Sequence, residues 1–342
     1  MKRKGYAVCL AILLLLTGCT LKEKKPTQYQ ATFLDVFDTV TTIVGYAESE
    51  EAFQEKVQPI HEKLMEYHQL FDIYQEYDGI TNLKTINDQA GKNPVTVDEK
   101  IIELLTVCRE FYEMTDGKVN IAMGSVLSLW HDAREKGNAD PQNAVLPEKA
   151  ALKEAAMHTA MEDVIIDEEK NTVFLRDALL SLDVGAIAKG FAAQKVTEEM
   201  EEGMLLSVGG NVCASGPKDD EGTPWIVGIE NPDSKTAEYL HTLMVTEGCV
   251  VTSGDYQRVY TVDGEQYHHI IDPQTLYPST YWSAVTIVCM DSGVADMLST
   301  ALFLMPMEEG EKLLQQFDAE AMWVSKDGEQ FYSSGFATKI RT

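Results

Sequence analysis

Two Asp-Gly pairs, each set between short runs of strand-forming residues, restrict the fold more than any other feature of the sequence. Asp263-Gly264 and Asp327-Gly328 have the composition of two-residue turns that join antiparallel strands. A third pair of strand-like runs lies between residues 164 and 175. We therefore expect three hairpins, at residues 259–271, 322–332 and 164–175.

Helical segments alternate with these hairpins. Apolar residues recur at helical spacing over residues 57–70, and Asp98 can cap a helix that stops at Gly117. Hairpins mixed with helices favour an α+β fold, with hairpin-rich mixed sheets and packed helices, over a doubly wound parallel sheet. Further helices are expected at residues 185–200 and 293–305, and further strands at 33–46, 179–182 and 283–289.

The first nineteen residues have the form of a bacterial lipoprotein signal. Three basic residues, Lys2 to Lys4, precede an apolar stretch that ends at Leu16-Thr17-Gly18-Cys19. This order predicts a signal peptide at 1–18, a lipid on Cys19, a polar tether at 19–31 and a folded domain at 32–342. The protein would then lie on the extracytoplasmic face of the cell membrane. The alternative is an uncleaved signal anchor with an incidental Cys.

The charge of the chain limits the ligands it can bind. The formal net charge is -27, which makes nucleic acid a poor partner because its phosphate backbone is repelled. An anionic nucleotide would need a site in which metal ions, Lys or backbone N–H groups oppose the surrounding field.

Four Cys remain outside the N-terminal signal: Cys108, Cys213, Cys249 and Cys289. They are widely spaced and form no Cys-x-x-Cys pair, so a metal cluster is not expected. Their apolar settings favour buried free thiols, although an oxidising compartment would permit disulfides in three connectivities.

Two segments rich in small residues can approach an anionic ligand. Residues 182–190 end an expected strand at Asp183 and place Lys189 in the first turn of a helix, where free N–H groups favour negative charge. The alternative is that Asp183 caps the helix and Lys189 is solvated. Gly209-Gly210 follows another expected strand and lets the backbone come close to a ligand, but tight turns have the same composition.

Two further segments carry groups suited to proton transfer and metal binding. His269 and Asp272 can form a base with an orienting carboxylate, although a packed His with an Asp-Pro turn fits the pattern better. Asp296 and Thr300 are four residues apart and share one face of a helix. Their oxygens suit Mg²⁺, although this spacing also arises by accident.

Taken together and in this order, these segments resemble the ApbE family of flavin transferases (FAD:protein FMN transferases). The resemblance runs from about residue 33 to residue 336 and implies an ApbE-like, T-fold-like α+β structure. It is carried by Asp183-Val184-Gly185-Ala186-Ile187-Ala188-Lys189-Gly190, Val208-Gly209-Gly210-Asn211, Ser253-Gly254-Asp255-Tyr256 with His269-Ile270-Ile271-Asp272-Pro273, and Ala295-Asp296 through Thr300-Ala301.

The resemblance implies roles for the matching positions. His269 stands where the family has its catalytic base. The metal ligands would be the backbone carbonyl of Ala186, Asp296 and Thr300, which together would bind Mg²⁺. The contacts to the flavin nucleotide would be Phe37, Tyr74, Asn120, Ile121, Ala122, Asp183, Lys189, Ile270 and Ile271.

Three positions depart from the family pattern. Phe37-Asp38-Thr39 stands in place of Met-Gly-Thr, Asn120 in place of Asp, and Leu276 in place of Gly. The first two put the contacts to the flavin ring and the adenosine in doubt. None of the three alters the expected metal ligands or His269.

The implied reaction is Mg²⁺-dependent transfer of FMN from FAD to a Thr or Ser hydroxyl of a target redox protein, with release of AMP. The partners would be FAD and a flavoprotein subunit of an extracytoplasmic or membrane redox complex. Three alternatives stay open: a Mg²⁺-dependent FAD pyrophosphatase, a flavin-binding lipoprotein without activity, and the substrate-binding lipoprotein of an importer. The last would have two similar α/β lobes, which the hairpin pattern does not favour.

Overall fold

One antiparallel sheet organises the molecule. The structure is a computed structural model that describes residues 26–233 and 237–341. Every neighbouring pair in the eight-stranded sheet is antiparallel, which confirms the predicted α+β class. In spatial order the strands are β1 (Thr27–Val36), β2 (Thr39–Ala47), β6 (Met204–Val208), β7 (Asn211–Ala214), β10 (Gly248–Gly254), β13 (Ala284–Cys289), β14 (Ala319–Val324) and β15 (Gln330–Tyr332).

Smaller sheets lie around the main one. All three predicted hairpins are present, as β4–β5, β11–β12 and β14–β15. The first of these also pairs with β3, and a separate hairpin consists of β8 and β9. The strands outside the main sheet are β3 (Val95–Thr96), β4 (Val164–Asp167), β5 (Thr172–Leu175), β8 (Trp225–Glu230), β9 (Tyr239–Val245), β11 (Tyr260–Val262) and β12 (Glu265–Tyr267).

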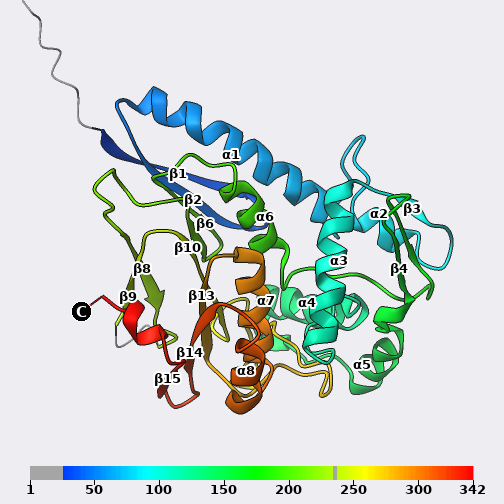
Figure 1. Cartoon of the computed structure of the whole chain (residues 1–342). Coiled ribbons are helices and arrows are strands. Elements are labelled where there is room, and N and C mark those ends of the chain that lie inside the picture. The colour runs from blue at the N-terminus through cyan, green and yellow to red at the C-terminus, as the bar shows by residue number, and fades with distance from the viewer. Residues whose placement is uncertain (1–25, 234–236, 342) are drawn as a thin grey trace, which may run out of the picture.

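Helices cover one face of the main sheet, and the β8–β9 hairpin lies on the other side (Figure 1). Alternation along the strands produces this division, because Leu206 and Val251 join the helix-side core while Leu205 and Val250 face the hairpin. The helices are α1 (Glu50–Phe71), α2 (Leu83–Asp88), α3 (Glu99–Met114), α4 (Gly124–Ala139), α5 (Lys149–Ala155), α6 (Ala188–Thr197), α7 (Ser292–Phe303) and α8 (Met307–Leu314).

Helices α6 and α7 approach each other unusually closely at Gly190. A Cβ atom on Gly190 would lie 2.4 Å from the carbonyl oxygen of Ser292 and 2.5 Å from the Cβ of Asp296. Only glycine fits there, because no side-chain atom can occupy that space. The close approach sets Lys189, the neighbour of Gly190, beside Asp296.

Two predicted strands differ from the structure. Residues 33–46 belong to two strands, β1 and β2, because Phe37 and Asp38 form a turn with φ of 54° and 49°. Strand-forming Val, Phe and Thr residues continue on both sides of this turn, so the sequence pattern hid it. Residues 179–182 form no strand beyond a single bridge between Ser181 and Met123. The helix expected from residue 185 begins at Ala188.

The predicted lipoprotein signal, including Cys19, lies outside the described residues. Strand β1 begins at Thr27, so residues 27–31, which we expected to be part of the tether, pair with β2. Among the described residues, no helix is both long and apolar enough to cross a membrane. The four Cys of the body are free thiols, and all but the partly exposed Cys289 are buried.

Candidate active site

A cleft opens where the ends of β6, β7 and β10 meet α4, the start of α6 and one face of α7. It collects residues from all four glycine-rich and polar motifs that carry the family resemblance, although these lie far apart along the chain. The predicted site residues that line it are Tyr74, Asn120, Ile121, Asp183, Ala186, Lys189, His269, Ile270, Ile271, Asp296 and Thr300.

Two predicted flavin contacts do not line the cleft. Phe37 lies in the β1–β2 turn, where its N–H donates to Nδ1 of His68 at 3.1 Å and its ring meets His68 edge-on. Ala122 is fully buried, and its N–H donates to Oδ1 of Asn120 at 2.8 Å. Ala122 therefore positions the Asn120 side chain. A direct flavin contact for Phe37 or Ala122 stays a prediction.

The carboxylate of Asp296 lies between α7 and α6. Its Oδ2 accepts a hydrogen bond from the backbone N–H of Gly190 at 2.9 Å and lies 3.6 Å from Nζ of Lys189. The residue is only 4% exposed, so the carboxylate is held in one orientation by the α6–α7 contact. Among the described residues, Oδ1 has no hydrogen-bond partner, which leaves it available to a ligand.

Three oxygen donors fit a magnesium ion in this part of the cleft. The Ala186 carbonyl, the free carboxylate oxygen of Asp296 and the Thr300 hydroxyl all belong to residues that line the cleft, and Asp296 and Thr300 share one face of α7. Mg²⁺ prefers oxygen ligands and commonly keeps water and substrate phosphate in its shell. In the described part of the chain, no group of three or more His, Cys, Asp or Glu could hold a metal by itself. The donor set therefore fits an ion whose shell a phosphate ligand completes.

His269 is held as a neutral base. Its Nδ1 lies 3.2 Å from the carbonyl oxygen of Gln257. A carbonyl can only accept, so Nδ1 carries the proton and Nε2 keeps its lone pair. Burial, followed by the charges of Arg258 and Lys189, lowers the pKa of His269 to about 3. The imidazole is therefore uncharged and able to accept a proton at neutral pH.

The neighbours of His269 have structural roles. His268 also lines the cleft, but it is buried and donates from Nε2 to the carbonyl of Ser279 at 2.9 Å. Asp272 accepts from the N–H of Gln274 at 2.7 Å and lies 3.5 Å from Nζ of Lys118. The hypothesis of a His269–Asp272 pair is therefore wrong, and the alternative of a turn-forming Asp-Pro is confirmed.

Asp183 is a partly buried carboxyl that lines the cleft. Its Oδ1 accepts the N–H of Gly185 at 2.8 Å, so it closes a local turn and does not cap α6, whose N-cap is Ile187. Burial raises the pKa of Asp183, and the positive charge of Arg258 opposes that rise. A carboxyl of this kind can receive hydrogen bonds from the polar edge of a nucleotide or ring.

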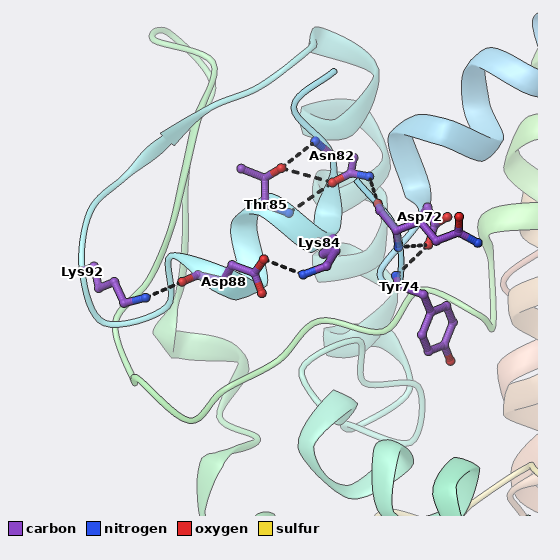
Figure 2. A network of polar contacts seen from close by, with 8 residues as sticks. Asp72, Tyr74, Asn82, Lys84, Thr85, Asp88 and Lys92 are labelled. Atoms are coloured by element: carbon purple, nitrogen blue, oxygen red, sulfur yellow. Dashed lines mark hydrogen bonds and ion pairs between the residues drawn. The ribbon is translucent and has the colours of Figure 1, made fainter. Parts of the chain in front are cut away.

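A fixed loop presents the ring of Tyr74 (Figure 2). Oδ1 of Asp72, at the end of α1, accepts the N–H of Tyr74 at 2.6 Å, and the buried Asn82 donates to the carbonyl of Gln75 at 2.8 Å. Asn82 also accepts the N–H of Thr85 at 3.1 Å in a capping box that starts α2. The loop is therefore tied to two helices, and Tyr74 stacks on His131 with ring centroids 5.2 Å apart.

Sequence reasoning missed several polar groups of the cleft. Lys118, Arg134 and Arg258 line it together with Lys189, so four cations gather in a strongly acidic protein. Arg258 lies two residues after the Ser253–Tyr256 motif, which was the available signal. The side-chain amide nitrogen of Asn211 is buried in the cleft wall without a partner among the described residues, so it can donate to a ligand.

The antiparallel fold and this cleft, with four cations and a neutral imidazole in its lining, are typical of an α+β enzyme that acts on an anionic ligand. The chain belongs to the ApbE family, whose sequence model matches residues 37–323. The predicted resemblance to the ApbE family and the predicted ApbE-like fold are therefore confirmed.

Relatives and solved structures agree with this membership. A FAD:protein FMN transferase from Treponema pallidum is 34% identical over 277 residues, which cover 76% of this chain and 75% of that protein. One from Klebsiella pneumoniae is 31% identical over 278 residues, covering 78% and 84%. The crystal structure of an ApbE protein from Thermotoga maritima is 28% identical, with a TM-score of 0.80, and covers 92% of this chain and 100% of that one.

Proposed function

We propose that this protein is a Mg²⁺-dependent FAD:protein FMN transferase that moves FMN from FAD to a Thr or Ser hydroxyl of a target redox protein. The observation that carries the proposal is the presence in one cleft of a neutral base, His269, and of hard oxygen donors on Asp296 and Thr300. The names of the relatives support the same activity.

The residues of the chain suggest a direct displacement. Nε2 of His269 takes the proton from the acceptor hydroxyl, and that oxygen forms a bond to the FMN-side phosphorus. The bond between this phosphorus and the bridging oxygen breaks, and AMP leaves with the bridging oxygen and the electron pair. Lys189 and Arg258 hold the pyrophosphate in place and offset its charge.

Bound Mg²⁺ would supply Lewis-acid stabilisation of the pyrophosphate charge, from a position next to Ala186, Asp296 and Thr300. Residues of the chain orient the Asp296 carboxylate for this role. The Gly190 N–H and the Lys189 ammonium keep the Asp296 carboxylate turned toward the cleft. The stacked pair of Tyr74 and His131 forms a flat wall against which a ring can lie.

The N-terminal pattern supports a location for this reaction. A lipid on Cys19 would keep the enzyme on the extracytoplasmic face of the membrane, near flavoprotein subunits of redox complexes. In that setting the target would be a membrane-associated or extracytoplasmic protein.

Intact-protein mass spectrometry tests the proposal. The soluble domain is mixed with FAD, Mg²⁺ and a redox subunit, and the subunit is weighed with and without EDTA. We expect a mass increase equal to FMN that EDTA abolishes. Release of free FMN and AMP without an adduct would instead identify a pyrophosphatase.

A matched pair of variants sharpens the test. Asp296→Asn keeps the shape of the side chain but removes its charge, and it should lower Mg²⁺-dependent transfer by about 100-fold or more. Asp291→Asn makes the same change at the N-cap of the same helix, where Asn is equally suitable, and should leave transfer unchanged. Equal activity of both variants would remove Asp296 from the metal site.

A further inference from the structure

A second hollow lies on the face of the main sheet opposite α6 and α7. The β8–β9 hairpin stands beside this face and leaves a groove of about 700 Å³, within the size range of ligand sites. Residues of β8 form one wall and residues of the main sheet form the floor. They include Ile226, Val227, Gly228 and Glu230 on the wall, and Thr42, Leu205, Ser207 and Val212 on the floor.

The groove adjoins the active-site cleft. Gly209, Thr252, Gln257 and Arg258 line both hollows. The carbonyl of Gln257 is the group that orients His269, so the groove ends beside the base. At the junction, Gly209 has a φ of 58°, and a Cβ there would lie 2.6 Å from Oγ1 of Thr39, so only glycine fits at this position.

The chemistry of the groove differs from that of the cleft. Three of its apolar residues are unusually exposed, with Val40 at 53%, Ile226 at 38% and Tyr239 at 46%. Its charged residues are Asp38 and Glu230, with Arg258 at the junction. An anionic nucleotide is poorly suited to two carboxylates, whereas exposed apolar and hydroxyl groups suit a polypeptide.

The length of the groove also fits an extended peptide. Residues 226–230 of β8 span roughly 13 Å, about the length of four residues of an extended chain. In the described part of the chain, β8 pairs only with β9. The proposed transfer needs two substrates, FAD and the acceptor protein. Because the cation-rich cleft suits the anionic FAD, the acceptor needs a separate site that adjoins the cleft.

We propose that this groove binds an extended segment of the acceptor protein and guides its hydroxyl past Gly209 to His269. The inference rests on the proposed transferase function. It assigns FAD to the cleft and the acceptor polypeptide to the groove, so that the two substrates meet at Gln257 and Arg258.

Substitutions on two sides of the groove test this assignment. Ile226→Glu and Val40→Glu place a charge where an apolar contact with the acceptor is expected. Ile165→Glu is the matched control, because Ile165 is also 38% exposed on a strand, β4, but lines neither hollow. The readouts are the KM for a redox subunit that the wild-type enzyme labels and the Kd for FAD from flavin fluorescence.

Both groove variants should raise the KM for the acceptor by about tenfold or more and change the Kd for FAD by less than twofold. Ile165→Glu should leave both values as in the wild type, and unchanged FAD binding shows that a variant is folded. An unchanged KM for the acceptor in both groove variants would overturn this inference but not the proposed function. A loss of FAD affinity as large as the rise in KM would also overturn it, because the groove would then bind the flavin. A wild-type enzyme that binds FAD but labels no subunit would overturn the proposed function as well.

Discussion

At the residue scale, the state of His269 depends on one carbonyl and on burial. The Gln257 carbonyl oxygen at 3.2 Å accepts the Nδ1 proton, so the lone pair stays on Nε2. Burial and nearby cations lower the pKa, which keeps the ring neutral in the free enzyme. Bound pyrophosphate would oppose this effect because its negative charge favours the protonated ring.

The lowered pKa of His269 predicts how the stability of the FAD-free protein depends on pH. The pKa is about 3 in the folded protein and about 6.5 in the unfolded chain, so between these values only the unfolded chain binds the proton. Stability is therefore unaffected above pH 6.5 and falls as the pH is lowered below it. Between pH 6.5 and 5 the wild type should lose on the order of 1–2 kcal/mol more than His269→Gln.

Urea unfolding of both proteins at the two pH values measures this difference. The variant serves as the control for all other titrating groups, because it removes only the imidazole. Parallel pH profiles for the two proteins would mean that His269 titrates normally in the folded state.

At the element scale, the contact between α6 and α7 positions the Asp296 carboxylate in the cleft. Gly190 in α6 and Asp296 in α7 are 106 residues apart but share a hydrogen bond. Ala192 and Ala193 in α6 are fully buried, so small side chains keep α6 close to its neighbours. The contact thereby fixes the distance between the ammonium of Lys189 and the carboxylate of Asp296.

Gly190→Ala tests this contact. The added methyl group would overlap the Ser292 carbonyl and the Asp296 side chain, so α6 must move away from α7. We expect a loss of about 1–3 kcal/mol in stability from overpacking and a rise in the Mg²⁺ concentration needed for transfer. Thermal unfolding and a Mg²⁺ titration measure the two effects. Wild-type values for both would show that the helices can separate without cost to the site.

Local patterns predicted the type of most elements but not their partners. Asp98 caps α3 as expected, and the Asp-Gly turns form hairpins, because caps and two-residue turns depend on neighbouring residues only. The β1–β2 turn was missed because Phe37, a bulky residue, adopts a positive φ that its side chain disfavours. Tertiary pairing with β6 compensates for that strain by holding β2 in register.

At the scale of the whole molecule, an acidic protein must admit an anionic ligand. In the proposed function, the formal net charge of -27 repels FAD at long range, whereas Lys118, Arg134, Lys189 and Arg258 attract it at short range. The screening length falls from about 30 Å at 10 mM salt to about 8 Å at 150 mM. Salt therefore weakens the long-range repulsion between FAD and the acidic surface more than it weakens the short-range attraction between FAD and the cleft cations.

We expect the association rate constant of FAD to rise severalfold between 10 and 150 mM salt. Stopped-flow measurement of flavin fluorescence quenching determines it. A rate constant that falls with salt would mean that the cleft cations dominate the approach of the ligand.

The sequence by itself determined the chemistry of the site. Asp296 and Thr300 share a helix face because of the helical period, and both line the cleft. The Gly209-Gly210 pair and the order of the motifs, taken together, indicated the family whose model matches residues 37–323.

Only the tertiary structure decided how these groups meet. The tautomer of His269 depends on the Gln257 carbonyl, and the orientation of Asp296 depends on the Gly190 N–H. Asp272 is not the partner of His269, because its carboxylate closes a local turn and lies near Lys118. The groove beside β8 has no sequence motif, because it is a space between a hairpin and a sheet face. Local residue spacing determines which functional groups a segment supplies, whereas packing between distant segments determines which of these groups lie together in one site.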